Sequence, residues 1–177
     1  MTYTQHYDSP LGGILLAADE EGLTGLWFDG QKYFARTLPK EYAESETPVL
    51  CEAKRWLDIY FSGREPDFTP PLHPEGSAFQ QAVWALLLEI PYGATTTYGT
   101  LARKLAEKQG LTHMSAQAVG GAVGHNDISL IIPCHRVVGA SGSLTGYAGG
   151  VDKKIKLLEL ERADMKSFFV PKKGTAL

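Results

Sequence analysis

A cysteine, a histidine and an arginine stand side by side in an otherwise apolar run, Ile131-Ile132-Pro133-Cys134-His135-Arg136-Val137-Val138. A free thiol with a pKa of about 8.5 is only slightly ionised at neutral pH, so a nucleophilic cysteine needs a base or a positive partner that lowers this value. His135 can accept the proton through a water molecule or carry positive charge beside the sulfur. The run therefore predicts that Cys134 is a nucleophile whose thiol has a lowered pKa.

Glu161 is the carboxylate that we expect behind the imidazole. The last predicted helix extends from about Asp152 to Arg162 and carries an apolar stripe. Glu161 follows Leu157 at a spacing of four beside that stripe, so it leans towards the core. A carboxylate on the second imidazole nitrogen of His135 would hold the required tautomer and stabilise the imidazolium.

Two interpretations that give these residues a purely structural role stay open. A cysteine in an apolar run is most often a small buried hydrophobe, and a single histidine there is usually a satisfied core side chain. The run from Cys134 to Arg136 after a proline weighs against both. A metal site is disfavoured because the histidines and Cys51 show no ligand spacing around Cys134. We expect no metal and no cofactor.

The composition is that of a soluble globular protein of one or two domains, with 177 residues, 44% hydrophobic and 21% charged. The first apolar stretch, 14–18, is too short to cross a bilayer and no signal peptide precedes it, so we expect a cytoplasmic protein without a membrane partner. Residues 1–74 hold 6 Lys and Arg against 12 Asp and Glu, whereas residues 75–177 hold 11 against 8. A polyanion would prefer the C-terminal part.

The elements that must position these residues fall into two predicted domains. Strands at 13–18 and 23–28, with a hairpin turn between them, and a helix that Thr47 caps indicate a small α/β unit in residues 1–74. The proline-rich, aperiodic segment 67–76 is the predicted linker. Residues 75–177 form the second domain.

Helices dominate the predicted second domain. Ser77 begins a capping box before a helix that ends at Pro91, a short strand covers 95–98, and a further helix covers 100–109. The helix 116–124, capped by Ser115, contains three glycines, each of which costs about 1 kcal/mol against alanine. A helix with such small side chains, placed after a turn, predicts a helix-turn-helix that approaches another surface closely. Tight packing of this helix inside the protein explains the small side chains equally well.

These residues resemble the O6-alkylguanine-DNA alkyltransferases, also called methylated-DNA protein-cysteine methyltransferases. The segment 133–138 is similar to the active-site signature of that family, and the resemblance continues without an obvious gap from Phe79 to Glu161, more loosely over 1–74. It implies a ribonuclease H-like α/β domain of the βαβ type, followed by a mainly α, winged helix-turn-helix domain. The activity it implies is DNA repair, in which the alkyl group of O6-alkylguanine moves irreversibly to Cys134, once per molecule. It also allows O4-alkylthymine as a substrate.

The resemblance also implies roles for individual residues. Cys134 would be the alkyl acceptor, His135 the water-mediated base, Glu161 its carboxylate and Asn126 a hydrogen-bonding support. The partner would be double-stranded DNA, bound by a monomer in the minor groove with the alkylated base flipped out. The residues expected to face DNA are Tyr98, which crowds the target phosphate, and Thr97, Ser115, Ala116, Gln117, Ala118, Gly120, Gly121 and Arg136. The base pocket is expected to comprise Pro133, Val137, Tyr147, Ala148 and Gly149. Ala148, being small, indicates room for more than methyl.

Two positions depart from the family's pattern. Gln117, neutral and shorter, stands where many members carry an arginine that enters the stack in place of the flipped base. Asp127 stands where a proline often follows the supporting asparagine, and we expect it to add negative charge near the DNA-facing side and to weaken binding.

Three other classes of function fit less well. A protein that recognises alkylated DNA without repairing it would lack the reactive cysteine. A cysteine hydrolase with a Cys-His-Glu triad needs an oxyanion arrangement, for which the sequence offers only generic loops. A winged-helix transcription regulator would carry several base-reading side chains on its helix, where 116–124 offers only Gln117.

Overall fold

In the computed structural model, which describes residues 1–171, the chain divides into two compact units. The first unit holds residues 1–75 and 127–131, and the second holds residues 76–126 and the chain from Ile132 onward. None of the helices in the described residues combines the length and the apolar character that crossing a membrane requires.

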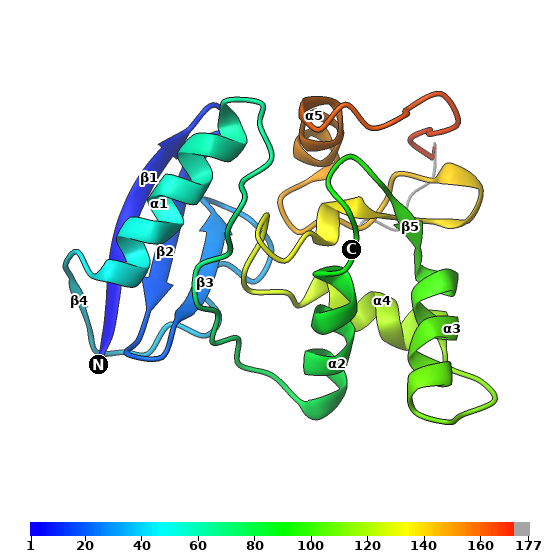
Figure 1. Ribbon diagram of the computed structural model, residues 1–177, viewed down its shortest axis with the longest axis horizontal. Coiled ribbons are helices and arrows are strands. Elements are labelled where there is room, and N and C mark those ends of the chain that lie inside the picture. The colour runs from blue at the N-terminus through cyan, green and yellow to red at the C-terminus, as the bar shows by residue number, and fades with distance from the viewer. Residues whose placement is uncertain (172–177) are drawn as a thin grey trace. The chain divides into compact units, whose positions relative to one another are not determined.

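The first unit is a four-stranded sheet with one helix on one of its faces (Figure 1). Its elements are β1 (Thr2–Ser9), β2 (Gly12–Ala18), β3 (Leu23–Phe28), β4 (Tyr42–Glu44) and α1 (Pro48–Phe61). The strand order is β3-β2-β1-β4, in which only β4 and β1 are parallel. The apolar pattern predicts β2, β3 and α1. It misses β1, because this strand buries only Thr4.

A segment from the middle of the chain completes the first unit. The Leu26 amide donates to the Asp127 carbonyl at 2.8 Å, and the Ser129 amide donates to the Leu26 carbonyl at 3.1 Å. The Asp127 carboxylate accepts a hydrogen bond from Trp27 Nε1 at 3.1 Å and forms an ion pair with Arg36. Its side chain is 2% exposed. The expectation that Asp127 presents negative charge to DNA is therefore wrong, because the carboxylate is buried and compensated.

As far as residue 171, the second unit contains four α-helices, two short 3-10 helices (η1 and η2) and a short two-stranded parallel sheet. Its elements are α2 (Ala78–Leu87), β5 (Thr96–Thr97), α3 (Tyr98–Lys108), α4 (Ala116–Gly124), η1 (Cys134–Arg136), β6 (Val137–Val138), η2 (Ala140–Gly142) and α5 (Val151–Leu160). α4 lies between α2 and α3 (Figure 1). The predicted capping box of Ser77 and the cap of Ser115 are confirmed. α3 begins two residues earlier than predicted because Thr97 caps it.

The glycines of α4 differ in their surroundings. A Cβ atom on Gly120 would lie 3.6 Å from the ring of Tyr98, so this glycine packs closely against α3. A Cβ atom on Gly121 or Gly124 would meet nothing within 4 Å. Packing inside the unit thus accounts for only one of the three glycines, and the other two leave the outer side of the helix bare.

The proline-rich segment predicted as a linker is bound to the first unit. The Leu23 amide donates to the Pro71 carbonyl and the His73 amide donates to the Leu23 carbonyl, both at 2.8 Å. The His73 ring contacts Asp19 through Nδ1 at 2.7 Å and Glu21 through Nε2 at 2.9 Å. Asp19 also accepts the amides of Glu21 and Gly22 and so forms the hairpin turn. His73 therefore joins the end of the segment to that turn.

This arrangement predicts a pH-dependent contribution to stability. The hydrogen bond to Asp19 raises the pKa of His73 above its ordinary value of 6.5. Because the raised value belongs to the folded state, the contribution is fully present below about pH 6.5 and is lost as the pH rises through the folded pKa. His73→Gln should lower the free energy of unfolding by about 0.5 kcal/mol at low pH, as for other exposed ion pairs, and by nothing at high pH. Urea unfolding at pH 6 and pH 9 measures this, and an equal loss at both values would contradict it.

Candidate active site

Cys134 begins a single 3-10 turn that follows a buried irregular segment. The Cys134 amide donates to the Ile132 carbonyl at 2.8 Å, and the Arg136 amide donates to the Pro133 carbonyl at 3.0 Å. The turn holds the side chains of Cys134, His135 and Arg136 below 9% exposure, so three polar or reactive groups lie in the interior. Each of them must therefore find partners within the protein.

Glu161 is the partner of both His135 and Arg136. Its Oε2 lies 2.5 Å from Nε2 of His135, and its Oε1 accepts Nε of Arg136 at 2.8 Å and the amide of Gly93 at 3.0 Å. Arg136 donates further to the carbonyl of Ile90 at 2.8 Å. The carboxylate at the end of α5 thus holds η1 and the loop after α2 together, and the predicted inward orientation of Glu161 is confirmed.

These contacts determine which nitrogen of His135 carries the proton. Burial alone would raise the pKa of Glu161, but the hydrogen bonds and charges of His135 and Arg136 hold it well below its usual range. Burial lowers the pKa of His135, even with the carboxylate beside it. A neutral imidazole next to an ionised carboxylate must donate through Nε2, because that carboxylate only accepts. Nδ1, which is buried, is then the basic nitrogen.

The thiol does not have the lowered pKa that the sequence predicts. Burial raises the pKa of Cys134, because a charged sulfur would lose its hydration. A hydrogen bond from Asn126, the charge of Lys154 and the amides of Cys134 and His135 act in the opposite direction. Asn126 is itself fixed by a bond from Nδ2 to the Ile132 carbonyl at 2.8 Å. The resting group is therefore a protonated thiol, with hydrogen-bond donors and a positive charge already in place to stabilise the thiolate.

Lys154 is a member of the site that the sequence analysis did not identify. Its side chain is fully buried, and Nζ donates to the carbonyls of Val137 at 2.5 Å and Thr145 at 2.8 Å. Burial lowers its pKa to about 8, while the nearby Cys134 raises it. Lys154 precedes Leu157 by three and Glu161 by seven residues, so the helical spacing that turned Glu161 inward also turned Lys154 inward. That spacing could have identified it.

Tyr98 and Tyr147 also belong to the neighbourhood of the thiol. Burial, and then the charge of Cys134, raises the pKa of Tyr98 to about 12. The Tyr98 hydroxyl is buried and has no hydrogen-bond partner among residues 1–171. The ring of Tyr147 stands edge-on to His135, with ring centroids 6.4 Å apart. Val137 and Pro133 are buried beside the turn, whereas Ala148 and Gly149 are half-buried.

The residues expected to face DNA separate into two groups. Ser115, Ala116, Gln117, Ala118 and Gly121 are exposed along α4, and Thr97 is the half-buried cap of α3. Gly120 is buried against Tyr98, which corrects the expectation that it faces DNA. Arg136 is different, because it is 8% exposed and its guanidinium is engaged by Glu161 and Ile90. This burial corrects the expectation that Arg136 contacts DNA: it neutralises a buried carboxylate instead.

Neither a second thiol nor a metal-binding cluster accompanies the site in the part of the chain that the structure describes. Cys51 lies in the first unit, exposed on α1, and both cysteines are free. Among residues 1–171, no three His, Cys, Asp or Glu side chains form a group that could hold a metal ion.

Comparison with known proteins identifies the chain. Residues 78–163 match the model of the 6-O-methylguanine DNA methyltransferase DNA binding domain, and residues 2–74 match that of the ribonuclease-like domain. The chain belongs to the 6-O-methylguanine DNA methyltransferase family. Its two-domain architecture, with a ribonuclease-like N-terminal domain and a DNA-binding C-terminal domain, is that of the family.

Relatives in this methyltransferase family match over nearly the whole chain. The methylated-DNA–protein-cysteine methyltransferase of Methanosarcina acetivorans is 46% identical over 90% of this chain and 97% of its own. That of Haemophilus influenzae is 42% identical over 90% and 86%. The crystal structure of Mycobacterium tuberculosis OGT in complex with DNA has a TM-score of 0.78 and 41% identity, covering 91% of this chain and 94% of that one.

Replacing the central carboxylate tests the network. Glu161→Gln keeps the shape but leaves the buried Arg136 without its counter-charge, so the free energy of unfolding should fall by about 3 kcal/mol. Chemical denaturation measures this loss. Glu159→Gln, an exposed neighbour on α5, is the control and should leave stability within about 0.5 kcal/mol. Equal losses in the two variants would contradict the role of Glu161.

Replacing Lys154 tests its electrostatic action on the thiol. Lys154→Met keeps most of the buried chain volume but removes the positive charge near Cys134, so the thiol pKa should rise further. Thiolate absorbance followed against pH measures this value directly, which a purely structural role would not change. Lys156→Met, exposed on the same helix, should leave the thiol pKa as it is in the parent protein. An unchanged pKa in Lys154→Met would refute the assignment.

Proposed function

We propose that this protein repairs DNA by transferring the alkyl group of O6-alkylguanine to its own Cys134, with O4-alkylthymine as a second substrate. The observation that carries the proposal is a buried Cys134 beside His135, whose Nε2 is 2.5 Å from Glu161, in a chain of the methyltransferase family. The names of the relatives, methylated-DNA–protein-cysteine methyltransferases, support the same activity.

The reaction is a displacement at the alkyl carbon. His135 Nδ1 takes the thiol proton through a water molecule, and Glu161 stabilises the imidazolium that results. The sulfur then forms a bond to the alkyl carbon while the bond from that carbon to O6 breaks. The electron pair stays on guanine, which takes up the proton that the His135 imidazolium gives back through water. Guanine is restored and a thioether remains on Cys134. Since a thioether is not readily reversed, each molecule acts once.

The substrate base must leave the helix to reach the sulfur. The alkylated oxygen lies inside the base stack, so the nucleotide is flipped into a pocket at a cost of a few kcal/mol. We place Pro133, Val137, Tyr147, Ala148 and Gly149 in the wall of that pocket. Tyr98, whose buried hydroxyl lacks a partner among the described residues, crowds the target phosphate from the start of α3.

The second unit is the DNA-binding part in this proposal. α3 and α4 act as the two helices of a winged helix-turn-helix, and α4 enters the minor groove of double-stranded DNA. Its bare side, which bears Gln117, Ala118 and Gly121, supports a close approach to the groove floor. Gln117 fills the gap that the flipped base leaves. The protein acts as a monomer, in the cytoplasm, where thiols stay reduced.

Each of the two predicted domains has its own role in this proposal. Residues 1–74 support the active site, and residues 75–177 bind DNA and accept the alkyl group. A recognition protein without repair activity is disfavoured by the presence of Cys134. A hydrolase is disfavoured because the amide of Cys134 is engaged by the Ile132 carbonyl and the amide of His135 acts on the thiol, which leaves neither to stabilise an oxyanion.

Mass spectrometry tests the proposal. After incubation with an oligonucleotide that contains O6-methylguanine, the peptide with Cys134 should gain one methyl group per molecule, with no further turnover. Cys134→Ala should abolish the gain but keep its affinity for the duplex, because the small change removes only the acceptor. Cys51→Ala is the control and should react like the parent protein. Methyl transfer by the Cys134→Ala protein would eliminate the proposal.

A further inference from the structure

The loop between β6 and α5, residues 139–150, borders the active site, and we call it the pocket loop. The ring of its Tyr147 stands edge-on to His135, with ring centroids 6.4 Å apart, and Tyr147 is 4% exposed. Cys134 is only 5% exposed. A substrate therefore reaches the sulfur only where a segment beside it gives way.

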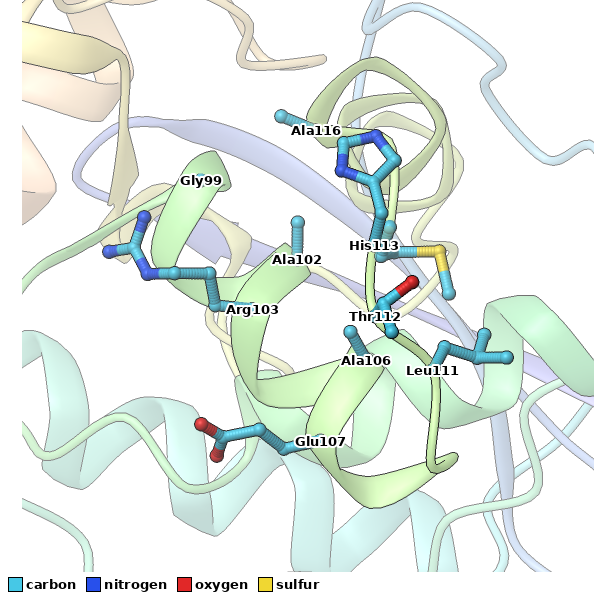
Figure 2. A pocket seen from close by; sticks show the side chains of 10 residues that line it. Gly99, Ala102, Arg103, Ala106, Glu107, Leu111, Thr112, His113 and Ala116 are labelled. Atoms are coloured by element: carbon cyan, nitrogen blue, oxygen red, sulfur yellow. The ribbon is translucent and has the colours of Figure 1, made fainter.

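A groove elsewhere in the second unit does not lead to the thiol. Figure 2 shows this groove, of about 470 Å³, along α3 and the connection to α4. Its lining residues all lie between Gly99 and Ala116, and so include neither Cys134 nor any part of the pocket loop. η1 is fixed by the bonds of its side chains to Glu161. The pocket loop is thus the side of the site that adapts to a substrate.

The backbone of the pocket loop does not hold its own position. Ser141 and Gly142 have left-handed φ angles of 63° and 90°, and such a conformation at a residue other than glycine persists only when the surroundings impose it. The Gly139 amide donates to the Ser143 carbonyl at 2.8 Å, and the Gly142 amide donates to the Gly139 carbonyl at 3.1 Å. Bonds over so few positions shape the loop but do not attach it to the rest of the unit.

A segment after α5, residues 163–169, attaches the pocket loop from outside, and we call it the C-terminal strap. The Leu144 amide donates to the Phe169 carbonyl at 2.8 Å, and the Phe169 amide donates to the Gly142 carbonyl at 3.1 Å. These two bonds form a single parallel bridge between the segments. The strap therefore adds a short strand to the loop.

The strap and the loop are also in close contact through Phe168. A Cβ atom on Gly142 would collide with the carbonyl oxygen of Ser167 and would lie 3.1 Å from the Phe168 ring, so only glycine fits there. The Phe168 ring packs on a buried apolar cluster of three residues, Val138, Leu144 and Leu158. This cluster joins β6, the pocket loop and α5, and the ring covers it.

Lys154 holds the next residue of the loop. Its Nζ donates to the Thr145 carbonyl at 2.8 Å and to the Val137 carbonyl at 2.5 Å. Residues 142–145 are thus attached by the strap at Gly142 and Leu144 and by Lys154 at Thr145. Because Tyr147 follows two residues later, these attachments fix the part of the loop that borders the site.

We propose that the C-terminal strap limits the size of the alkyl group that Cys134 accepts, and that Phe168 is a positioning residue that acts through the pocket loop. This inference rests on the proposed function. A methyl group needs little displacement of Tyr147, whereas a benzyl group needs the loop to move outward. Moving the loop breaks contacts with the strap, so an intact strap favours small groups.

The test compares two substrates, duplex oligonucleotides that carry O6-benzylguanine or O6-methylguanine. Mass spectrometry of the Cys134 peptide over time gives the rate constant of each transfer. Phe168→Ala should raise the ratio of benzyl to methyl transfer about fivefold, because the partly buried ring no longer binds the strap to the cluster. Gly142→Ala displaces the strap from the loop side and should raise the ratio too. A general loss of folded protein lowers both rates together and leaves their ratio unchanged.

Phe169→Ala is the matched control, because it removes the same ring one residue later, where the side chain is 48% exposed and the backbone bonds persist. It should keep the parent ratio. Phe168→Leu restores most of the apolar contact and should return the ratio to within about twofold of the parent value. Melting temperatures check that each variant folds, and Gly142→Ala decides the test if Phe168→Ala does not fold.

Two results would overturn the role of the strap. One is an unchanged ratio in the folded variants Phe168→Ala and Gly142→Ala, and the other is an equal rise in Phe169→Ala. Transfer by the parent protein with either of these results refutes the strap alone. A parent protein that gains neither a methyl nor a benzyl group refutes the proposed function itself.

Discussion

An ionised carboxylate in the protein interior is the constraint around which the second unit is built. An isolated buried charge is very unfavourable, so Glu161 is retained only with full compensation, which comes from His135, Arg136 and the Gly93 amide. These partners belong to three separate stretches of the chain. Satisfying one carboxylate therefore fixes the end of α5, the turn η1 and the loop after α2 together. The same bond decides that Nε2 of His135 is the donor and Nδ1 the base.

The second feature of the site is a thiol that rests in its protonated form. Burial favours the protonated form, whereas Asn126, Lys154 and two amides are already directed to stabilise a thiolate. In a protein that acts once, a permanently ionised and exposed thiol would be consumed by any electrophile. A buried thiol reacts only with a group that reaches the interior of the protein. This preorganisation explains why a raised thiol pKa is compatible with nucleophilic function.

On the surface that we propose for DNA, the helix that would approach the groove carries no charge of its own. α4 is bare on its outer side, because Gly121 and Gly124 face open space and only Gly120 is required by packing against Tyr98. A helix without large side chains can enter a narrow groove, but it contributes little electrostatic attraction. The lysines and arginine of the neighbouring α3 can supply that attraction without obstructing the approach.

Local features of the sequence determined the caps of α1, α2 and α4, the Cys-His pair and the inward side of α5, because each depends on residues a few positions apart. The resemblance to the alkyltransferases added the expected activity. Tertiary structure determined which groups the buried polar side chains pair with, since these partners are distant in the chain. Arg36 and Asp127 are 91 residues apart, and Arg136 and Ile90 are 46 apart. The sequence suggested that Asp127 and Arg136 face DNA, whereas the fold pairs them with Arg36 and Glu161 in the interior. Burial of Cys134 in the fold also raises the pKa of its thiol.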